Sequence, residues 1–125
     1  MIIFAYPIYY SNLPKIVRDF IVENKNLWKG KHIFIICTMG LFSGDGAGVS
    51  ARLFRQYGAD IIGSIHVIMP DCICDVGLLK FSPARNRKII DKADFRLKTA
   101  TINLPTENGE YKWIVTTASK KVNCF

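Results

Sequence analysis

Two loops hold the residues whose types and spacing are most informative about chemistry. The first, Tyr6–Asn12, reads Tyr-Pro-Ile-Tyr-Tyr-Ser-Asn and combines three tyrosine rings, a rigid proline and two small polar side chains. Ring faces together with a few fixed hydrogen-bonding groups suit a flat heteroaromatic ligand. The same composition is also typical of a surface turn whose tyrosines pack against neighbouring helices. The loop on its own leaves both interpretations open.

The second loop, Thr38–Gly48, is rich in glycine. Glycines allow a positive φ and a close approach of the backbone to a ligand, and a glycine-rich segment before a helix can mark a phosphate site. However, the spacing in Gly44–Gly48 matches neither the Walker A loop nor the dinucleotide-binding fingerprint. A capping loop and a phosphate cradle are both compatible with this segment.

The cysteines do not form a recognisable redox or metal motif. Cys72 and Cys74 are separated by one residue, unlike a Cys-x-x-Cys pair, and Cys37 and Cys124 are isolated. No close run of cysteines suits an iron–sulfur cluster. We expect reduced thiols in packing or loop positions, with Cys37 as a small apolar residue of a strand.

Other reactive side chains are scattered. His32 and His66 fall within expected strands, where a histidine is usually a core or strand-end residue. Asp71 and Asp75 could bind a cation, although loop carboxylates usually face water. No nucleophile–base pair or metal cluster stands out, so we assign no catalytic and no metal-binding residue.

The elements that must position these loops are three strands and three helices. Ile2–Tyr6, His32–Thr38 and Ile61–Met69 are nearly continuous apolar runs, which is typical of parallel strands covered on both faces. Each run precedes a helical pattern of apolar residues. Ser11 or Asn12 is expected to cap the first helix. The apolar positions are Leu13, Ile16, Val17, Phe20 and Ile21, then Val49, Leu53, Phe54 and Tyr57, then Ile89, Ile90, Ala93, Leu97 and Ala100.

Strands that alternate with helices predict an α/β fold, a three-layer open parallel sheet with right-handed crossovers. Ligands of such sheets bind beyond the carboxyl ends of the strands. That rule selects the loops Tyr6–Asn12, Thr38–Gly48 and Pro70–Asp75 and places them along one edge.

Size and charge limit the function classes. The chain has 125 residues, half of them apolar, enough for one compact domain. No apolar run is long enough to cross a membrane, and we expect a cytoplasmic protein. Most of the formal net charge of +7 lies after residue 80. A solvated helix face explains this better than nucleic-acid binding, for which no motif is present. The basic residues concerned are Arg85, Arg87, Lys88, Lys92, Arg96 and Lys98.

The C-terminal stretch allows two interpretations. Thr99–Leu104 and Tyr111–Thr117 are compatible with two strands of a short hairpin around Asn108-Gly109. Equally, the third helix could continue to about Ile102 and leave the rest loosely ordered.

Three segments, in this order and spacing, resemble flavodoxin-like proteins. They are Tyr6–Tyr9 followed by Leu13–Ile21, then Ile36–Gly40, and then Ile68–Val76. The nearest likeness is to the flavodoxin part of proteins in which this domain is joined to a ferredoxin-type iron–sulfur domain. The resemblance covers about residues 1–100. It implies a truncated flavodoxin-like domain over residues 1–102 and a C-terminal tail over residues 103–125.

The resemblance also implies a cofactor, FMN, and a set of binding residues. The two loops that match Tyr6–Asn12 and Thr38–Gly48 flank the isoalloxazine ring in that family. The flavin would transfer electrons while the protein tunes its potential, so no general acid or base is required. The implied ring-binding residues are Pro7, Tyr9, Tyr10, Ser11 and Asn12 on one side and Thr38, Met39, Gly40 and Phe42 on the other.

The chain departs from the family pattern in one important way. The first strand of a flavodoxin and the loop that wraps the FMN phosphate have no counterpart upstream of Ile2. The strand Ile2–Tyr6 would then have an unpaired outer edge, which invites pairing with another chain. We therefore expect a homodimer or a partner chain that supplies the missing half, or a C-terminal segment Tyr111–Thr117 that folds back onto the edge.

Two functions follow as expectations. The first is an electron-transfer-related protein with weak or partner-dependent FMN binding. The second is a cofactor-free remnant or interaction module of flavodoxin fold that acts through homodimerisation or a partner chain.

Overall fold

Strands alternate with α-helices along the chain in the computed structural model, which describes residues 1–40, 42–70, 82–102, 104 and 112–115. The sequence predicts the strands to within two residues at each end. The elements are β1 (Ile2–Pro7), α1 (Lys15–Glu23), a short 3₁₀ helix (Lys25–Leu27), β2 (His32–Met39), α2 (Gly46–Gln56), β3 (Asp60–Ile68), α3 (Pro83–Ile102) and β4 (Lys112–Val115).

The sheet is open and entirely parallel, with the strand order β3-β2-β1-β4. β1 and β2 are in register from Ile2 opposite Ile33 to Pro7 opposite Thr38. This arrangement confirms the predicted α/β fold with strands and helices in alternation. β4 pairs with the outer edge of β1 from Ile2 to Ala5. A homodimer, a partner chain and the segment Tyr111–Thr117 were the three expected ways to cover this edge. The structure shows part of that segment, β4, paired with it.

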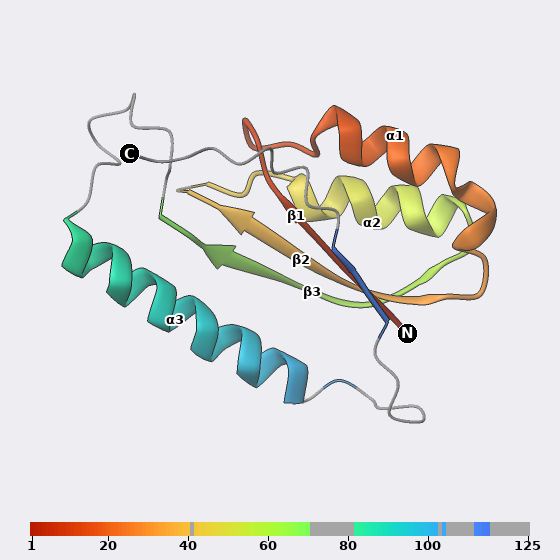
Figure 1. Ribbon diagram of the computed structural model, residues 1–125. Helices are drawn as coiled ribbons and strands as arrows, with labels where there is room; N and C mark the ends of the chain where they lie inside the picture. The colour runs from red at the N-terminus through yellow and green to blue at the C-terminus, as the bar shows by residue number, and fades with distance from the viewer. Residues whose placement is uncertain (41, 71–81, 103, 105–111, 116–125) are drawn as a thin grey trace.

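Helices cover both faces of the sheet (Figure 1). α1 and α2 pack on one face as the chain moves from β1 to β2 to β3, and α3 packs on the other face as the chain returns to β4. When right-handed crossovers run in opposite directions along a sheet, their helices lie on opposite faces. The crossover from β3 back to β4 runs opposite to the first two, so its helix, α3, forms the third layer.

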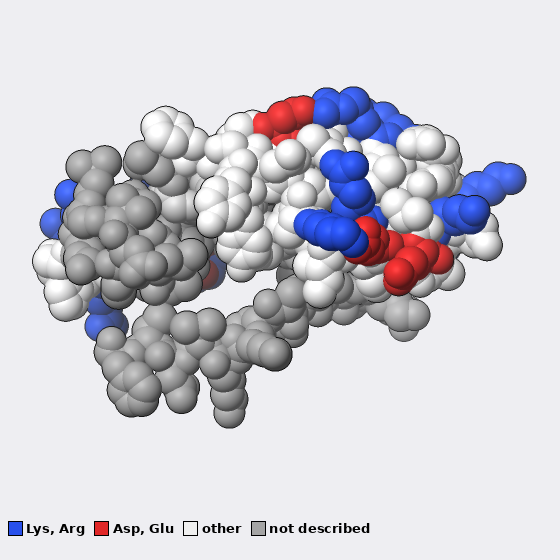
Figure 2. Space-filling model, turned by 90° about the horizontal axis from the view of Figure 1, so that it is seen from above, with Lys and Arg blue, Asp and Glu red and all other residues white. Residues whose placement is uncertain are grey.

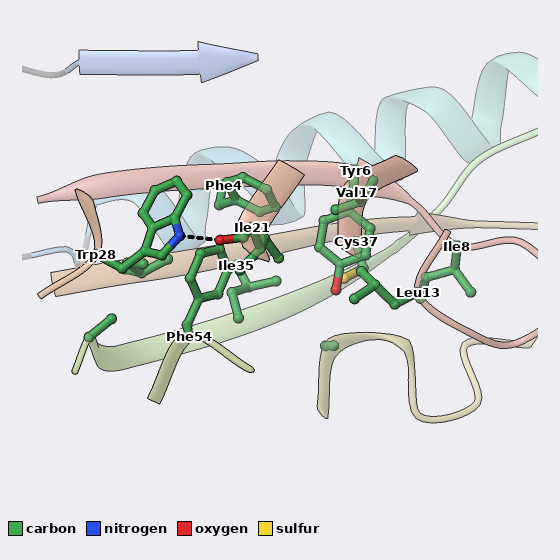
Figure 3. Close-up of a cluster of buried hydrophobic side chains, with 13 residues drawn as sticks. Phe4, Tyr6, Ile8, Leu13, Val17, Ile21, Trp28, Ile35, Cys37 and Phe54 are labelled. Atoms are coloured by element: carbon green, nitrogen blue, oxygen red, sulfur yellow. Dashed lines mark hydrogen bonds between the residues drawn. The ribbon is translucent and has the colours of Figure 1, made fainter. Parts of the chain in front are cut away.

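Aromatic rings fill the core between the sheet and the helices α1 and α2 (Figure 3). Phe4 and Phe54 meet edge to face with ring centroids 4.9 Å apart, and Trp28 meets Phe54 in the same way at 5.0 Å. The Trp28 indole N–H donates a hydrogen bond of 2.8 Å to the carbonyl oxygen of Ile21 in the last turn of α1. This cluster fixes the amino-terminal half of the sheet.

α1 corrects the prediction in two details. It begins at Lys15, and its N-cap is Pro14, which makes no side-chain capping bond. Neither Ser11 nor Asn12 caps the helix, because both belong to a separate tight turn before it. Ile16, expected on the apolar face, is 61% exposed, because the burial falls on Val17 and Ile21 instead.

α3 decides between the two interpretations of the C-terminal stretch. It continues through Thr99 to Ile102, so Thr99–Leu104 is not a hairpin strand. Ala93 is buried against the sheet, with Leu97 and Ala100 beside it, as predicted, whereas Ile90 is 47% exposed. The basic residues of α3 are all exposed, as expected for a solvated helix face.

Candidate functional site

The carboxyl edge of the sheet contains the point where the strand order reverses. The chain runs from β1 through β2 to β3 in one direction and then returns to β4 on the far side of β1. In open α/β sheets, ligands bind outside the carboxyl ends of the strands, at the point where the strand order reverses. The reversal lies between β1 and β4. The segment that leaves β1, residues 8–12, therefore lies at the position where a ligand is expected.

A tight turn follows β1. The Tyr9 N–H donates to the Asn12 carbonyl oxygen at 3.3 Å, and the Asn12 N–H donates to the Tyr9 carbonyl oxygen at 3.0 Å. The two central residues, Tyr10 and Ser11, have φ values of 50° and 58°. Such values are usual for glycine or asparagine and strained for a tyrosine. Strained backbone held by its surroundings is concentrated at functional sites.

This turn presents aromatic rings to solvent. Tyr9 is 51% exposed and Tyr10 is fully exposed. The ring of Phe42, in the loop between β2 and α2, is 73% exposed. Exposed rings that are grouped usually mark a binding site, because soluble proteins rarely leave a large apolar patch open to water. The carboxyl edge therefore offers three exposed ring faces on two loops.

The two loops touch at Gly44. A Cβ atom on Gly44, whose φ is +50°, would lie 2.5 Å from the Ser11 Cβ. No side chain larger than hydrogen fits there, so the loop after β2 packs directly on the turn after β1. The Ile8 N–H also donates to the Thr38 carbonyl oxygen at 2.8 Å, which extends the pairing of β1 and β2 into the loops.

The sequence-predicted site residues lie on these two segments. Pro7 and Thr38 are direct neighbours at the ends of β1 and β2, and they are half-buried, as is Met39. The structure thus brings both predicted loops to one edge. Of the third predicted loop, Pro70 is described and Asp71–Asp75 lies outside the described residues. The exposed members of the set are Tyr9, Tyr10, Ser11, Asn12, Gly40 and Phe42.

A buried polar group beneath the loops anchors α2 to β1. The Tyr6 hydroxyl donates to the Gly46 carbonyl oxygen at 2.8 Å and lies 2.6 Å from Ser50 Oγ. Burial raises the pKa of the Tyr6 phenol far above its usual value and that of the neighbouring Cys37 thiol to about 11 (Figure 3). Both groups are therefore neutral at physiological pH. The role of Tyr6 is to hold the first turn of α2, and with it the loop that contains Phe42.

Sequence reasoning missed Ser50 and Asp45. Ser50 is completely buried, and nothing in the sequence distinguishes it from a surface serine of a helix. Asp45 precedes α2 and forms an ion pair with Arg52. The hydrogen bond from Arg52 holds the pKa of the Asp45 carboxyl below its usual value. A seven-residue spacing of opposite charges on a helical pattern is the signal that would have found this pair.

The Asp45 carboxylate lies against the first turn of α2. A Cβ atom on Gly48 would overlap the Asp45 Oδ1 and lie 3.1 Å from its Cγ. A helix N-terminus attracts anions because its first backbone N–H groups have no partner within the helix and the positive end of the helix dipole lies there. At α2 the Asp45 carboxylate lies beside the first turn and pairs with Arg52, and it accepts no capping hydrogen bond from the helix.

A surface pocket lies at the opposite end of the sheet. Its residues precede β2 and β3, so it opens at the amino ends of the strands, away from the loops described above. The lining residues are Lys25, Asn26, Lys29, Gln56, Tyr57 and Gly58.

The remaining polar groups add no second reactive cluster within the described part of the chain. His32 is an exposed strand-end residue whose Nδ1 lies 3.1 Å from Asp60 Oδ2, and His66 is a strand residue. Among the described residues no group of three or more histidine, cysteine or acidic side chains is placed to hold a metal ion. None of the described helices is long and apolar enough to span a membrane.

No protein-family model and no curated protein sequence matches this chain. The fold and the geometry of the carboxyl edge are therefore the structural basis for a function.

Proposed function

We propose that the carboxyl edge between β1 and β4 binds the ring system of a flavin such as FMN, and that the protein takes part in electron transfer. One observation carries the proposal: two loops in direct contact present the exposed rings of Tyr9, Tyr10 and Phe42 beside the reversal of strand order. The resemblance of Tyr6–Tyr9, Leu13–Ile21 and Ile36–Gly40 to flavodoxin-like proteins supports the same ligand.

The residues of this edge fit an isoalloxazine ring. Aromatic side chains stack on flat heteroaromatic rings, and backbone groups of a tight turn can hydrogen-bond to the ring edge. The Tyr10 side chain loses no packing when it turns toward a ligand, because it is fully exposed in the free protein. A bound flavin supplies the redox chemistry, since it accepts and donates electrons at its ring.

The role of the protein's own residues is to bind and orient. Tyr6 and Ser50 hold the first turn of α2, and the contact of Gly44 with Ser11 sets the distance between the two loops. These contacts exist without a ligand, so little conformational entropy is lost when a ring binds. The exposed rings exclude water from one side of the ligand only, and we therefore expect weak binding.

β4 occupies the strand edge at which a homodimer or partner chain was expected to pair. It pairs with β1 over Ile2–Ala5, where the resemblance places the first strand of a flavodoxin. A second copy or a partner chain that pairs with this edge must displace β4. We propose that the free chain binds the ring with β4 in place and that a partner would strengthen the binding.

A titration with FMN tests the proposed function. Flavin fluorescence and visible absorbance are followed for the wild type, for Tyr10→Ala and for the control Phe95→Ala. Phe95 is a matched exposed ring, 71% accessible, on α3 across the sheet. A stacked ring contributes about 1–3 kcal/mol, so Tyr10→Ala should weaken binding about 5- to 150-fold, and Phe95→Ala should not change it.

Two results would contradict this function. If no spectral change occurs at high micromolar FMN, the free chain is not a flavoprotein. The alternative function, a cofactor-free interaction module, then replaces the proposed one. If both variants weaken binding equally, the flavin is not held at the carboxyl edge.

A further inference from the structure

The pocket at the amino ends of β2 and β3 is formed by two short segments. One segment follows α1, and the other ends α2 and continues into the turn before β3. The pocket has a volume of about 560 Å³, within the range of about 300–1,000 Å³ that is usual for sites of small ligands. Its lining residues are Lys25, Asn26 and Lys29 from the first segment and Gln56, Tyr57 and Gly58 from the second.

Hydrogen bonds hold the two walls of the pocket together. The Gly30 N–H donates to the Gly58 carbonyl oxygen at 2.9 Å, and the Asp60 N–H donates to the Lys31 carbonyl oxygen at 2.9 Å. A Cβ atom on Gly58 would lie 3.5 Å from Lys29 Cγ, so the stem of this lysine packs along the turn. The pocket is therefore formed before a ligand binds, and little conformational entropy is lost on binding.

Two lysines give the pocket a positive charge. Lys25 and Lys29 are exposed, and neither forms an ion pair with a residue that the structure describes. The carboxyl ends of α1 and α2 lie at the same place, and each brings a partial negative charge of about −0.5. Two ammonium groups outweigh these helix ends and leave a net charge of about +1. Figure 2 shows basic side chains that project into solvent at this end of the molecule.

The acidic side chains on the flanking elements do not cancel this charge. Asp60, at the start of β3, lies with its Oδ2 3.1 Å from His32 Nδ1. Glu23, the last residue of α1, pairs with neither lysine of the pocket. Lys31 and Arg55 are two further exposed basic residues on the same two segments. The surroundings of the pocket therefore attract anions.

The uncharged lining groups suit the rest of an organic anion. Asn26 and Gln56 are exposed, and their side-chain amides can donate hydrogen bonds to phosphate oxygens or accept them from hydroxyl groups. Tyr57 is half-buried and packs against the core, which fixes the position of its ring at the pocket. Fixed polar groups beside an aromatic ring are typical of sites for small molecules.

We propose that this pocket binds a small phosphate monoester of about the size of a nucleoside monophosphate, with Lys25 and Lys29 on its phosphate group. Such a group carries nearly two negative charges at neutral pH and three acceptor oxygens, which match two ammonium groups. A carboxylate offers one charge and fits the pair less well. Asn26, Gln56 and Tyr57 contact the remainder of the ligand.

The pocket and the proposed ring site lie at opposite ends of the same strands. β2 has eight residues and rises about 3.3 Å per residue, so about 25 Å separate its two ends. A small ligand in the pocket does not reach Tyr10 or Phe42. The two sites can therefore be tested separately.

Isothermal titration calorimetry at low ionic strength compares adenosine monophosphate (AMP) with adenosine, which lacks the phosphate. The proteins are the wild type, Lys25→Gln, Lys29→Gln, the double variant of both, and a control double variant, Lys88→Gln with Lys92→Gln. Lys88 and Lys92 are exposed and four residues apart, like the pocket lysines, but lie on α3. Glutamine keeps the stem of the side chain as far as Cγ, and far-ultraviolet circular dichroism checks that each variant folds.

The wild type should bind AMP at least about tenfold more tightly than adenosine, because hydrogen bonds to a charged group are strong. Each single substitution should weaken AMP binding about 3- to 10-fold, since exposed charge pairs are individually weak, and the double variant should weaken it further. The control removes the same charge from the opposite face and should leave the affinity for AMP unchanged.

Mapping of amide chemical shifts by nuclear magnetic resonance locates the bound AMP. The amides of Gly30 and Gly58 should move during the titration, and those of Tyr10 and Asn12 should not. Riboflavin has no phosphate and reports on the ring site alone. The double variant Lys25→Gln with Lys29→Gln should leave riboflavin binding unchanged.

Four results would overturn the phosphate pocket. AMP could fail to bind at millimolar concentration, or it could bind no better than adenosine. The two double variants could weaken AMP binding equally, which would show attraction by net charge alone. AMP could also move the amides of the turn after β1 instead of those of the pocket. None of these results concerns riboflavin, and a failure of riboflavin to bind the wild type would count against the ring site and leave the pocket standing.

Discussion

The contact of Gly44 with Ser11 gives the sharpest test of the site geometry, because the chain contains a matched control. Gly44 and Gly30 both have a positive φ, +50° and +68°. At Gly30 an added Cβ would meet no atom within 4 Å, whereas at Gly44 it would lie 2.5 Å from the Ser11 Cβ. Substitution of each by alanine therefore adds the same backbone strain but a different steric overlap.

The expected magnitudes follow from these two terms. The left-handed conformation costs an alanine about 1–2 kcal/mol, and this is the full cost at Gly30. Carbon atoms pack best at about 3.5–4.0 Å, so the overlap at Gly44 forces the two loops apart. Overpacking of this kind costs about 1–3 kcal/mol more. Gly44→Ala should therefore destabilise the fold more than Gly30→Ala by that second amount.

Urea unfolding followed by circular dichroism measures the free energy of unfolding of both variants, and a flavin titration measures the effect on the site. Gly44→Ala should weaken ring binding at least about fivefold, because separated loops no longer present their rings together. Gly30→Ala, at the amino end of β2, should leave binding unchanged. A difference in stability below about 0.5 kcal/mol, or equal binding by the two variants, would refute the loop contact as the organiser of the site.

Three further predictions concern the core, the strained turn and the buried thiol. Trp28→Phe should lower the free energy of unfolding by about 2 kcal/mol or more, because it leaves the buried carbonyl of Ile21 without its hydrogen bond. The control Leu27→Ala, at the neighbouring residue that is 57% exposed, should change it by no more than about 0.5 kcal/mol, and urea unfolding measures both. Tyr10→Asn should raise the stability by about 0.5–1 kcal/mol, because asparagine tolerates a positive φ, and should weaken flavin binding in the same titration. The pKa of Cys37 rises on folding from 9.0 to about 11, so the unfolded chain loses its proton first and the stability falls as the pH rises through that window. Cys37→Ala should make this fall shallower by up to about 1.4 kcal/mol per pH unit, and an unchanged slope in urea unfolding between pH 9 and 11 would show that the thiol is not buried.

The sequence alone determined the kind of fold and which loops lie together along one edge of the sheet. Continuous apolar runs such as His32–Thr38 require cover on both faces, and the alternation with helical patterns then implies a parallel sheet. Because carboxyl ends of parallel strands share one edge, strand direction is enough to place the loops after Tyr6 and Thr38 together. These inferences succeed because periodicity and chain direction are local properties.

Helix ends and single buried positions could not be decided in this way. The pattern of the first helix includes Leu13 and Ile16, yet the helix begins only at Lys15, after the turn at Tyr10 and Ser11, and Ile16 is exposed. The C-terminal helix and the hairpin were equally compatible with Thr99–Leu104. Packing of Leu97 and Ala100 on the sheet favours the helix, and that packing is a tertiary contact.

Only the tertiary structure decided which groups meet. The contacts of Tyr6 with Ser50 and of Ser11 with Gly44 could not be predicted from local sequence patterns, because more than thirty residues lie between the partners in each pair. It also decided that β4 covers the outer edge of β1, which created the reversal of strand order beside the loops. Local propensity cannot encode such pairings, because their free energy comes from long-range burial and hydrogen bonding that exist only when the sheet has formed.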